Sequence, residues 1–280
     1  MVTYNPDWVK AYYDDYGARE WERWDRSPVE RVKLAVHMHY LETTVQPGMR
    51  ILEIGAGAGR FTQALARLGA RVVVADISPV QLELNRENAR QLGFAAAVED
   101  WVECDMCALE THFADEAFDA VVCYGGPLSY VLERRDEALA ELRRVARPGA
   151  PLLFGVMGLW GTVHGALPGV LALPVEVNRD VVRTGRLNPA RGTGTHYCHM
   201  FRAAELRAAL EAAGLAVEAI SASNGLSAAW GEELAAIEQD PAKWAHLLEL
   251  EFEACREPGC VDMGTHIIAV ARKAPAAGAP

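Results

Sequence analysis

Apolar residues occur along the chain in short runs that alternate with longer amphipathic segments. Between residues 48 and 157 the runs are rich in Val, Ile and Leu, and turn residues such as Gly and Pro separate them. Such runs predict buried strands, and the segments between them predict helices of roughly 10–15 residues. The expected strands are 51–54, 72–75, 101–104 (the weakest), 118–123 and 151–156, and the expected helices are 61–68, 78–93 and 133–146.

The pattern continues toward both ends of the chain. A helix is expected from Ser27, an N-cap followed by Pro28 and by Glu30 three residues on, to about Val45. Residues 158–195 hold many glycines and prolines and show no clear period. Beyond them we expect a helix at 204–213, a strand at 216–222, helices between 232 and 255, and a last strand at 266–271.

Strands that alternate with helices predict an α/β fold, a doubly wound and mostly parallel sheet with helices on both faces. The seven expected strands make a seven-stranded sheet, with an N-terminal helical lid and a cap inserted after the fifth strand. The expected segments are a lid at 1–46, a ligand-binding core at 47–157, a cap and substrate insertion at 158–202, the remainder of the core sheet at 203–273, and a disordered tail at 274–280.

Composition narrows the range of partners. The 280 residues include 38 acidic and 27 basic side chains, which give a net charge of −11. A surface that neutralises a phosphate backbone needs an excess of Lys and Arg, so we expect no nucleic-acid partner. Neither a basic start followed by an apolar segment nor a long uncharged apolar run occurs. We therefore expect a cytoplasmic protein with no membrane association, and nothing in the pattern indicates its oligomeric state.

Six cysteines raise the question of a metal site. Cys104 and Cys107 form a C-x-x-C pair, whereas Cys255 and Cys260 lie far away with four residues between them. A structural zinc site needs four ligands, and no second close pair follows at a suitable spacing. We expect free thiols in a reducing compartment, and no metal.

The segment ILEIGAGAGRF at 51–61 places three glycines directly after the first expected strand. The dinucleotide fingerprint G-x-G-x-x-G needs its third glycine where Arg60 or Thr62 stands, and the Gly-Lys pair of a phosphate loop is missing here. The carboxylate of Glu53 would repel a pyrophosphate, but it suits a ligand that carries an ammonium group. The loop therefore favours a cationic ligand over a phosphate.

With these segments the chain resembles the class I S-adenosylmethionine-dependent methyltransferases. LEIGAGAGRF is similar to their first motif, and Asp76 in VVVADIS stands at the end of the second expected strand. ECDMC and FDAVVCYGGPLSY fall where their third and fourth conserved segments lie, and LRRVARPGAPLLFGV is similar to their helix, Pro-Gly turn and fifth strand. The resemblance covers residues 48–157 and extends loosely through HMFRAAELRAALEAAGLAVEAI.

The resemblance implies a binding site for S-adenosylmethionine, with S-adenosylhomocysteine as the product. The three glycines of the 51–61 segment would let the backbone approach the methionine moiety: Gly55, Gly57 and Gly59. Glu53 would order this loop and favour the cationic cofactor. Asp76, followed by Ile77, would accept both ribose hydroxyls, because one carboxylate can take two hydrogen bonds.

Further residues follow from the same resemblance. Asp105 would accept the adenine amino group, with Met106 beside the ring. Cys123 and Tyr124 would line the passage from cofactor to substrate. The aromatic segment DWVKAYYDDYGAREWERW resembles the lid helix of small-molecule methyltransferases, and its Tyr13 or Tyr16 would close over the cofactor.

The fourth segment, CYGGPLSY, narrows the methyl acceptor. Enzymes acting on base amino groups carry Asp or Asn, Pro-Pro and an aromatic residue there, and protein-arginine methyltransferases carry paired glutamates after this strand. Magnesium-dependent catechol enzymes carry an aspartate at its end. None of these patterns is present. The resemblance thus implies in-line methyl transfer to an N, O or C atom of a small, partly apolar molecule, without a metal.

An acceptor that must lose a proton needs a base, and histidine is the usual base near neutral pH. THYCHMF offers His196 and His199, which should face opposite sides of a strand, so only one is expected at the pocket. Our prediction is His199, with Tyr124 or Tyr130 as its hydrogen-bonding partner. Two alternatives stay open: a non-catalytic cofactor-binding module, and an aminopropyl transferase, which would need more acidic residues near the fourth strand.

Overall fold

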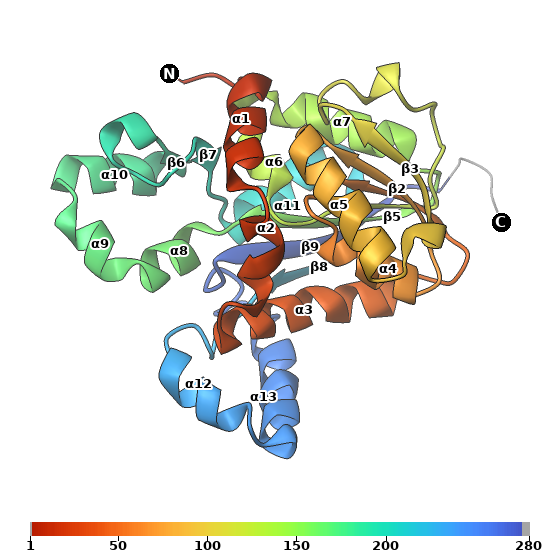
Figure 1. The fold of residues 1–280 in the computed structure, drawn as a ribbon. Helices are drawn as coiled ribbons and strands as arrows, with labels where there is room; N and C mark the ends of the chain where they lie inside the picture. Colours follow the sequence, from red (N-terminus) through yellow and green to blue (C-terminus); the bar gives the residue numbers. More distant parts are fainter. Residues whose placement is uncertain (1, 276–280) are drawn as a thin grey trace.

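The computed structural model describes residues 2–275, so most of the expected tail, residues 276–280, lies outside the described part (Figure 1). Its centre is a seven-stranded sheet with the order β3-β2-β1-β4-β5-β9-β8. Strands β1 to β5 pair in parallel, whereas β9 is antiparallel to both of its neighbours. The strands are β1 Arg50–Ile54, β2 Arg71–Asp76, β3 Val98–Glu103, β4 Ala120–Cys123, β5 Pro151–Met157, β8 Leu215–Ala222 and β9 His266–Lys273. The mostly parallel α/β sheet predicted from the sequence is confirmed.

Helices cover both faces of this sheet, which explains why its central strands are apolar throughout. In β1, Leu52 and Ile54 point into one hydrophobic cluster and Ile51 points into the other. Helices α3 (Pro28–Thr44), α4 (Arg60–Arg67) and α5 (Pro79–Gln91) cover the second cluster. Helices α6 (Pro127–Tyr130), α7 (Arg135–Val145) and α11 (Ala203–Ala212) cover the first.

Two helices precede α3 and cross the end of the sheet, between the core and the cap (Figure 1). They are α1 (Pro6–Tyr16), capped by Asn5, and the single turn α2 (Arg19–Glu22). We refer to α1 and α2 as the N-terminal arm. Helix α3 packs on the sheet through Val32, Val36 and Leu41, so the segment expected as a lid at 1–46 contains a core helix as well as the arm.

The segment after β5 projects from the core as a cap (Figure 1). It contains α8 (Leu159–Gly165), α9 (Leu167–Ala172), α10 (Val175–Thr184), and a small hairpin of β6 (Arg186–Leu187) and β7 (Cys198–His199). These helices are short, and their apolar residues are partly exposed, which explains why the sequence shows no clear period here. Leu171, for example, is 72% exposed.

The remaining elements differ little from the expectations. Helices α12 (Gly231–Ile237) and α13 (Pro241–Ala254) occupy the region expected to be helical between β8 and β9. Strand β3 begins at Val98, three residues early, because this edge strand carries exposed Glu99 and Asp100 that break the apolar pattern. Among residues 2–275, no helix combines the length and the apolar composition needed to cross a membrane.

Candidate functional site

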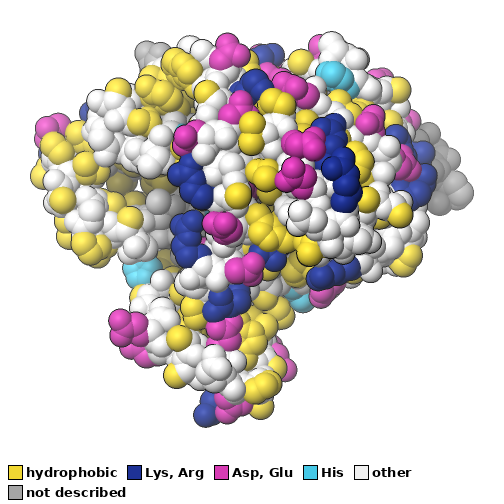
Figure 2. Space-filling model, viewed as in Figure 1, with side chains coloured by type: hydrophobic (Ala, Val, Ile, Leu, Met, Phe, Trp, Pro, Cys, Tyr) yellow, Lys and Arg dark blue, Asp and Glu magenta, His cyan; other side chains and the backbone are white. Residues whose placement is uncertain are grey.

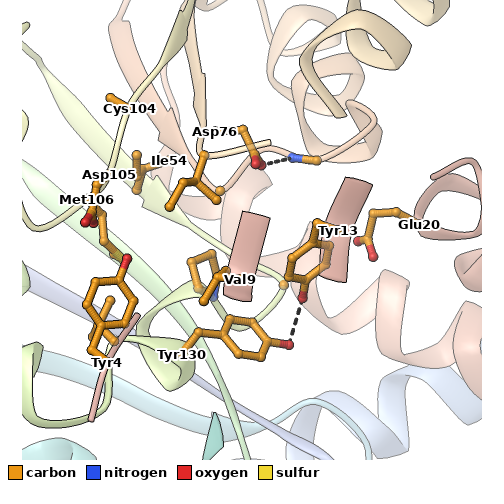
Figure 3. Close-up of a pocket in the computed structure, with 16 residues that line it drawn as sticks. Tyr4, Val9, Tyr13, Glu20, Ile54, Asp76, Cys104, Asp105, Met106 and Tyr130 are labelled. Atoms are coloured by element: carbon orange, nitrogen blue, oxygen red, sulfur yellow. Dashed lines mark hydrogen bonds between the residues drawn. The ribbon is translucent and has the colours of Figure 1, made fainter. Parts of the chain in front are cut away.

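A cavity opens where β1, β2 and β4 end, beneath the N-terminal arm (Figure 3). We refer to it as the first cavity. Parallel strands present their carboxyl ends at one edge of a sheet, which is the usual ligand site of such folds. Its lining residues are Tyr4, Val9, Tyr13, Glu20, Ile54, Gly55, Gly57, Asp76, Ile77, Cys104, Asp105, Met106, Gly125, Pro127, Tyr130 and Val131.

The glycine loop forms one wall of the first cavity through Gly55 and Gly57. Both have positive φ, and a Cβ on Gly55 would stand 2.1 Å from Pro127 Cγ. Gly59 does not line the cavity: it precedes α4, and a Cβ there would approach the Asn85 side chain at 2.9 Å. The expectation that all three glycines face the ligand is therefore corrected for Gly59, whose role is to bring α4 close to α5.

Glu53 lies behind this loop. It is 2% exposed and its Oε2 accepts a hydrogen bond of 2.6 Å from Thr62 Oγ1 in the first turn of α4. Burial raises the pKa of Glu53 to about 8, an effect that the Thr62 hydrogen bond opposes and the nearby Asp76 charge reinforces. Glu53 thus ties the loop to α4, but it is not among the residues that line the first cavity.

Asp76 reaches the first cavity from the end of β2, and Ile77 lies beside it. Its Oδ2 accepts a hydrogen bond of 2.8 Å from the Gly57 amide (Figure 3). Its Oδ1 accepts one of 2.9 Å from the Ser78 amide. Burial raises the pKa of Asp76 to about 6, while these backbone donors oppose the shift. The carboxylate is thereby fixed at the cavity wall in one orientation.

The loop after β3 supplies the far end of the first cavity. Asp105 and Met106 both line it, and Asp105 Oδ1 accepts a bond of 2.8 Å from the Cys107 amide. Tyr4, from the segment before α1, lies beside Met106 at this end of the cavity (Figure 3). Sequence reasoning missed Tyr4, because a residue ahead of the first helix gives no periodic signal that links it to β3.

The arm brings a charged pair to the near end of the cavity. Glu20 lines it, and Arg23 Nε donates to Glu20 Oε1 at 2.8 Å. Burial raises the pKa of Glu20, and the Arg23 charge partly offsets that rise. The Arg23 guanidinium lies 4.2 Å above the Trp24 ring, which anchors the pair to the core. The sequence shows these residues only as charges within an aromatic segment, so neither was predicted.

A second cavity, the inner cavity, lies next to the first and shares Tyr13, Glu20, Gly125 and Tyr130 with it. The hydroxyls of Tyr13 and Tyr130 are 2.8 Å apart, so these two side chains form the partition between the cavities (Figure 3). The other lining residues of the inner cavity are Tyr12, Tyr16, Arg23, Met157, His196 and His266.

An outer cavity continues from the inner one toward the cap. It shares Tyr12, Tyr13, Tyr130 and His196 with the inner cavity. Trp8 from α1 and Tyr197 from the cap stack there with ring centroids 5.0 Å apart. The outer cavity also shares Val9, Tyr13 and Tyr130 with the first, so the three cavities adjoin one another between the glycine loop and the cap.

Several predicted site residues lie elsewhere. Cys123 is fully buried in a hydrophobic cluster, because the alternation of β4 turns it under the sheet. Tyr124 packs on the opposite face against His37 and Phe61, at ring distances of 4.9 and 5.1 Å. Tyr16 lines the inner cavity and not the first. Tyr124 also lines a small pocket beside the first cavity, together with Glu20, Gly55 and Gly125, so its role at the passage stays a prediction. The expectations that Cys123 lines the passage and that Tyr16 covers the first cavity are corrected.

The positions of the two histidines of the cap hairpin are the reverse of those predicted from the sequence. His199 Nε2 meets Glu205 Oε1 at 2.7 Å, and its ring packs edge-on against Phe201. His196 lines both the inner and the outer cavity. The choice of His199 as the residue facing the pocket is corrected: the backbone between β6 and β7 turns His196 inward, while Glu205 at the start of α11 holds His199 outside.

Cysteines and charges add little further chemistry. All six cysteines are free, and five of them are buried. Across residues 2–275 no group of three or more His, Cys, Asp and Glu side chains is placed to hold a metal ion. Acidic and basic side chains are mixed over the face that carries the arm and α5 (Figure 2).

Comparisons with known proteins identify the family and the fold. A family model described as "Methyltransferase domain" matches residues 51–149. A ubiquinone biosynthesis O-methyltransferase of Xanthomonas axonopodis pv. citri is 30% identical over 192 residues, which are 66% of this chain and 71% of that protein. A demethylmenaquinone methyltransferase of Renibacterium salmoninarum is 31% identical over 191 residues, 62% of this chain and 71% of the relative.

A solved structure shows the same fold. The 1,6-didemethyltoxoflavin N1-methyltransferase of Burkholderia thailandensis, with bound S-adenosylhomocysteine, superimposes with a TM-score of 0.58 at 15% identity, over 98% of this chain and 92% of that one. The chain belongs to the class I S-adenosylmethionine-dependent methyltransferases. It is an enzyme of this family, and its cofactor is S-adenosylmethionine.

Proposed function

We propose that this enzyme transfers a methyl group to an N, O or C atom of a small, partly apolar molecule held in the inner cavity. The observation that carries this proposal is the pair of adjoining cavities separated only by Tyr13 and Tyr130. S-adenosylmethionine supplies an electrophilic methyl group on a sulfonium. In-line displacement needs donor and acceptor side by side, which two adjoining cavities provide.

The first cavity fits the cofactor in its polar groups. Asp76 offers a fixed carboxylate for two ribose hydroxyls, and Asp105 and Met106 offer an acceptor and an apolar face for the adenine. At the other end, the amides around Gly55, Glu20 of the arm and Arg23 just after it offer partners for the amino and carboxylate groups of a methionine. These assignments define the orientation of the cofactor in the proposal.

The inner cavity fits a small molecule. Its lining is mainly aromatic, and the similar proteins include quinone-biosynthesis methyltransferases. An aminopropyl transferase would need several acidic residues to hold a polyamine, whereas Glu20 is the acidic residue among those that line this cavity, and Arg23 is paired with it. The chemistry of the cavity therefore favours methyl transfer over that alternative.

The test follows the methyl group itself. Purified enzyme is incubated with isotopically methyl-labelled S-adenosylmethionine and with desalted macromolecular and small-molecule fractions of a bacterial extract, and mass spectrometry locates the label. Label in a small molecule is the expected result. Label in protein or RNA would overturn the acceptor class, and tight cofactor binding with no labelled product would favour a binding module.

A variant tests the proposed cofactor site separately. Asp76→Asn keeps the shape of the side chain but removes a charged acceptor, and hydrogen bonds to charged groups contribute about 1.5–3 kcal/mol. We expect the Kd for S-adenosylhomocysteine, measured by calorimetry, to rise about 10- to 100-fold. Asp100→Asn, on the exposed part of β3, is the matched control and should leave this Kd unchanged. Equal affinities of the two variants would place the ribose elsewhere.

A further inference from the structure

The inner cavity has flat, aromatic walls. The rings of Tyr12 and Tyr16 stack with centroids 5.8 Å apart, and Tyr13 meets Tyr130 edge-on at 5.6 Å. The Met157 thioether contributes a soft, polarisable surface to the same space. Walls of this kind complement a flat ring, since aromatic groups pair favourably face to face with an offset or edge to face.

His196 is held between these rings with one nitrogen free. Its Nδ1 lies 3.1 Å from Thr195 Oγ1, which in turn lies 3.2 Å from the Tyr12 hydroxyl. Its ring centroid stands 4.6 Å from that of Tyr12 and 5.1 Å from that of Tyr130. Among the described residues, buried Nε2 of His196 has no hydrogen-bond partner. A ring fixed through Nδ1 keeps Nε2 available for a bound molecule.

Arg23 and Glu20 both line the inner cavity, and Arg23 Nε donates to Glu20 Oε1 at 2.8 Å, so the two charges offset each other. Lys33, whose charge lowers the pKa of His266 after burial and Arg23, is likewise paired, with Glu30 Oε1 at 2.7 Å. Burial lowers the pKa of His196 to about 4, so its imidazole is neutral at neutral pH and Nε2 can accept a hydrogen bond. An aromatic cage alone would suit a quaternary ammonium, but such a group has no N–H to donate to the unpartnered Nε2 of a neutral His196, whereas a hydroxyl has a proton to donate.

We propose that the acceptor is a flat ring compound carrying an ionisable hydroxyl, and that His196 is the catalytic residue that takes its proton. This inference rests on the proposed function and specifies its substrate class. The hydroxyl proton moves to His196 Nε2, and the oxygen forms a bond to the methyl carbon. The carbon–sulfur bond breaks, its electron pair stays on sulfur, and the proton later leaves His196 for solvent. Charge and atoms balance without another reactant.

Two matched probes separate base catalysis from packing. 2-Naphthol must lose a proton on transfer, whereas 2-naphthalenethiol is already ionised at about pH 8 and needs no base. The variants are His196→Gln and, as a control, His199→Gln, whose native ring lies outside the cavity on Glu205. Methyl transfer to each probe is measured, together with calorimetric binding of S-adenosylhomocysteine and of 2-naphthol in its presence.

Loss of a general base costs about 10²–10⁴-fold in rate. We therefore expect His196→Gln to lower the rate with 2-naphthol at least about 100-fold, with the thiol rate and both affinities within about threefold, and His199→Gln to change neither rate. Equal losses with both probes, or no loss, would overturn the base assignment. A wild-type enzyme that binds S-adenosylhomocysteine but methylates neither probe would overturn the acceptor class alone, whereas failure to bind S-adenosylhomocysteine would instead refute the proposed function.

Discussion

At the scale of single residues, Glu53 shows how this loop uses a carboxyl group that is kept from water. The side chain is 2% exposed and bonded to Thr62, and Asn85 Nδ2 donates to the same Thr62 oxygen at 3.0 Å. A protonated Glu53 satisfies this network without a buried charge, because a carboxylic acid needs less solvation than a carboxylate. The residue that first pointed to a cationic ligand thus stabilises the loop from behind.

This environment gives a prediction for stability against pH. The folded pKa of Glu53, about 8, exceeds the ordinary value of 4.5, so its contribution is present at low pH and is lost as pH rises through that interval. The Glu53→Gln variant carries no ionisable group at this position, so it does not lose stability in this way as the pH rises. We measure the free energy of unfolding of the ligand-free protein by thermal denaturation. The variant should have the same stability as the wild type near pH 4, and its advantage over the wild type should grow by up to about 1.4 kcal/mol per pH unit toward pH 8.

A surface carboxylate provides the control for this measurement. Glu218 pairs with Arg272 at 2.6 Å, and both side chains are about 40% exposed. Glu218→Gln should change stability by less than about 1 kcal/mol, with no growth between pH 5 and pH 8. If Glu53→Gln raised the stability by the same amount at every pH, or lowered it increasingly as the pH rises, Glu53 would be ionised in the folded protein.

At the scale of elements, the N-terminal arm is fastened to the core by the start of α5. Gln81 Nε2 donates to the carbonyl oxygens of Tyr13 and Gly17, both at 3.0 Å, and Ser78 Oγ donates to Asp14 Oδ1 at 2.6 Å. Gln81 is fully buried. One helix start therefore holds the end of α1, the helix that carries Tyr13 to the partition between the cavities.

Removing this fastening should loosen the arm without unfolding the core. Gln81→Leu leaves two arm carbonyls without their donor, and each lost bond costs about 0.5–1.5 kcal/mol. Tryptic cleavage at Lys10 and Arg19 should become faster, and the Kd for S-adenosylhomocysteine should rise about tenfold. Gln91→Leu, at the exposed end of the same helix, should behave as the wild type in both assays. Unchanged cleavage of Gln81→Leu would show that the arm is held by other contacts.

The elements also show what the sequence could reveal. The parallel core was predictable, because each buried strand is visible in the sequence as a local apolar run. The placement of Asp76 and Asp105 was predictable too, because the carboxyl ends of parallel strands lie at one edge of the sheet. Glu20 and Arg23 were not, since the course of the arm depends on Trp24 packing between His37 and Phe61, contacts distant in sequence.

The histidine assignment failed for a similar reason. Alternation along a strand correctly separated His196 from His199, but it could not say which side faces the core. That choice is made by the partners: Glu205 on α11 takes His199, and Tyr12 on α1 packs on His196. Both partners lie outside the hairpin, so no pattern within the hairpin indicates them.

At the scale of the whole molecule, arm, cap and core enclose the cavities together. The first cavity belongs to the core and the arm, whereas the outer cavity lies between the arm and the cap. Trp8 is 48% exposed and stacks on Tyr197, which joins α1 to the cap over the outer cavity. A molecule that reaches the inner cavity through the outer one passes this contact, whereas the first cavity does not include it.

Trp8→Ala should therefore act on the acceptor and spare the cofactor. An aromatic pair contributes about 0.5–1.5 kcal/mol, so steady-state kinetics with the acceptor identified by label transfer should show a KM about three- to tenfold higher. The Kd for S-adenosylhomocysteine should stay within about twofold, because Trp8 does not line the first cavity. Trp230→Ala, which removes a 56% exposed ring just before α12, should change neither value. Were the cofactor affinity of Trp8→Ala to fall as far as the acceptor affinity, the contact would be holding the entire arm closed, and the two sites would open as one.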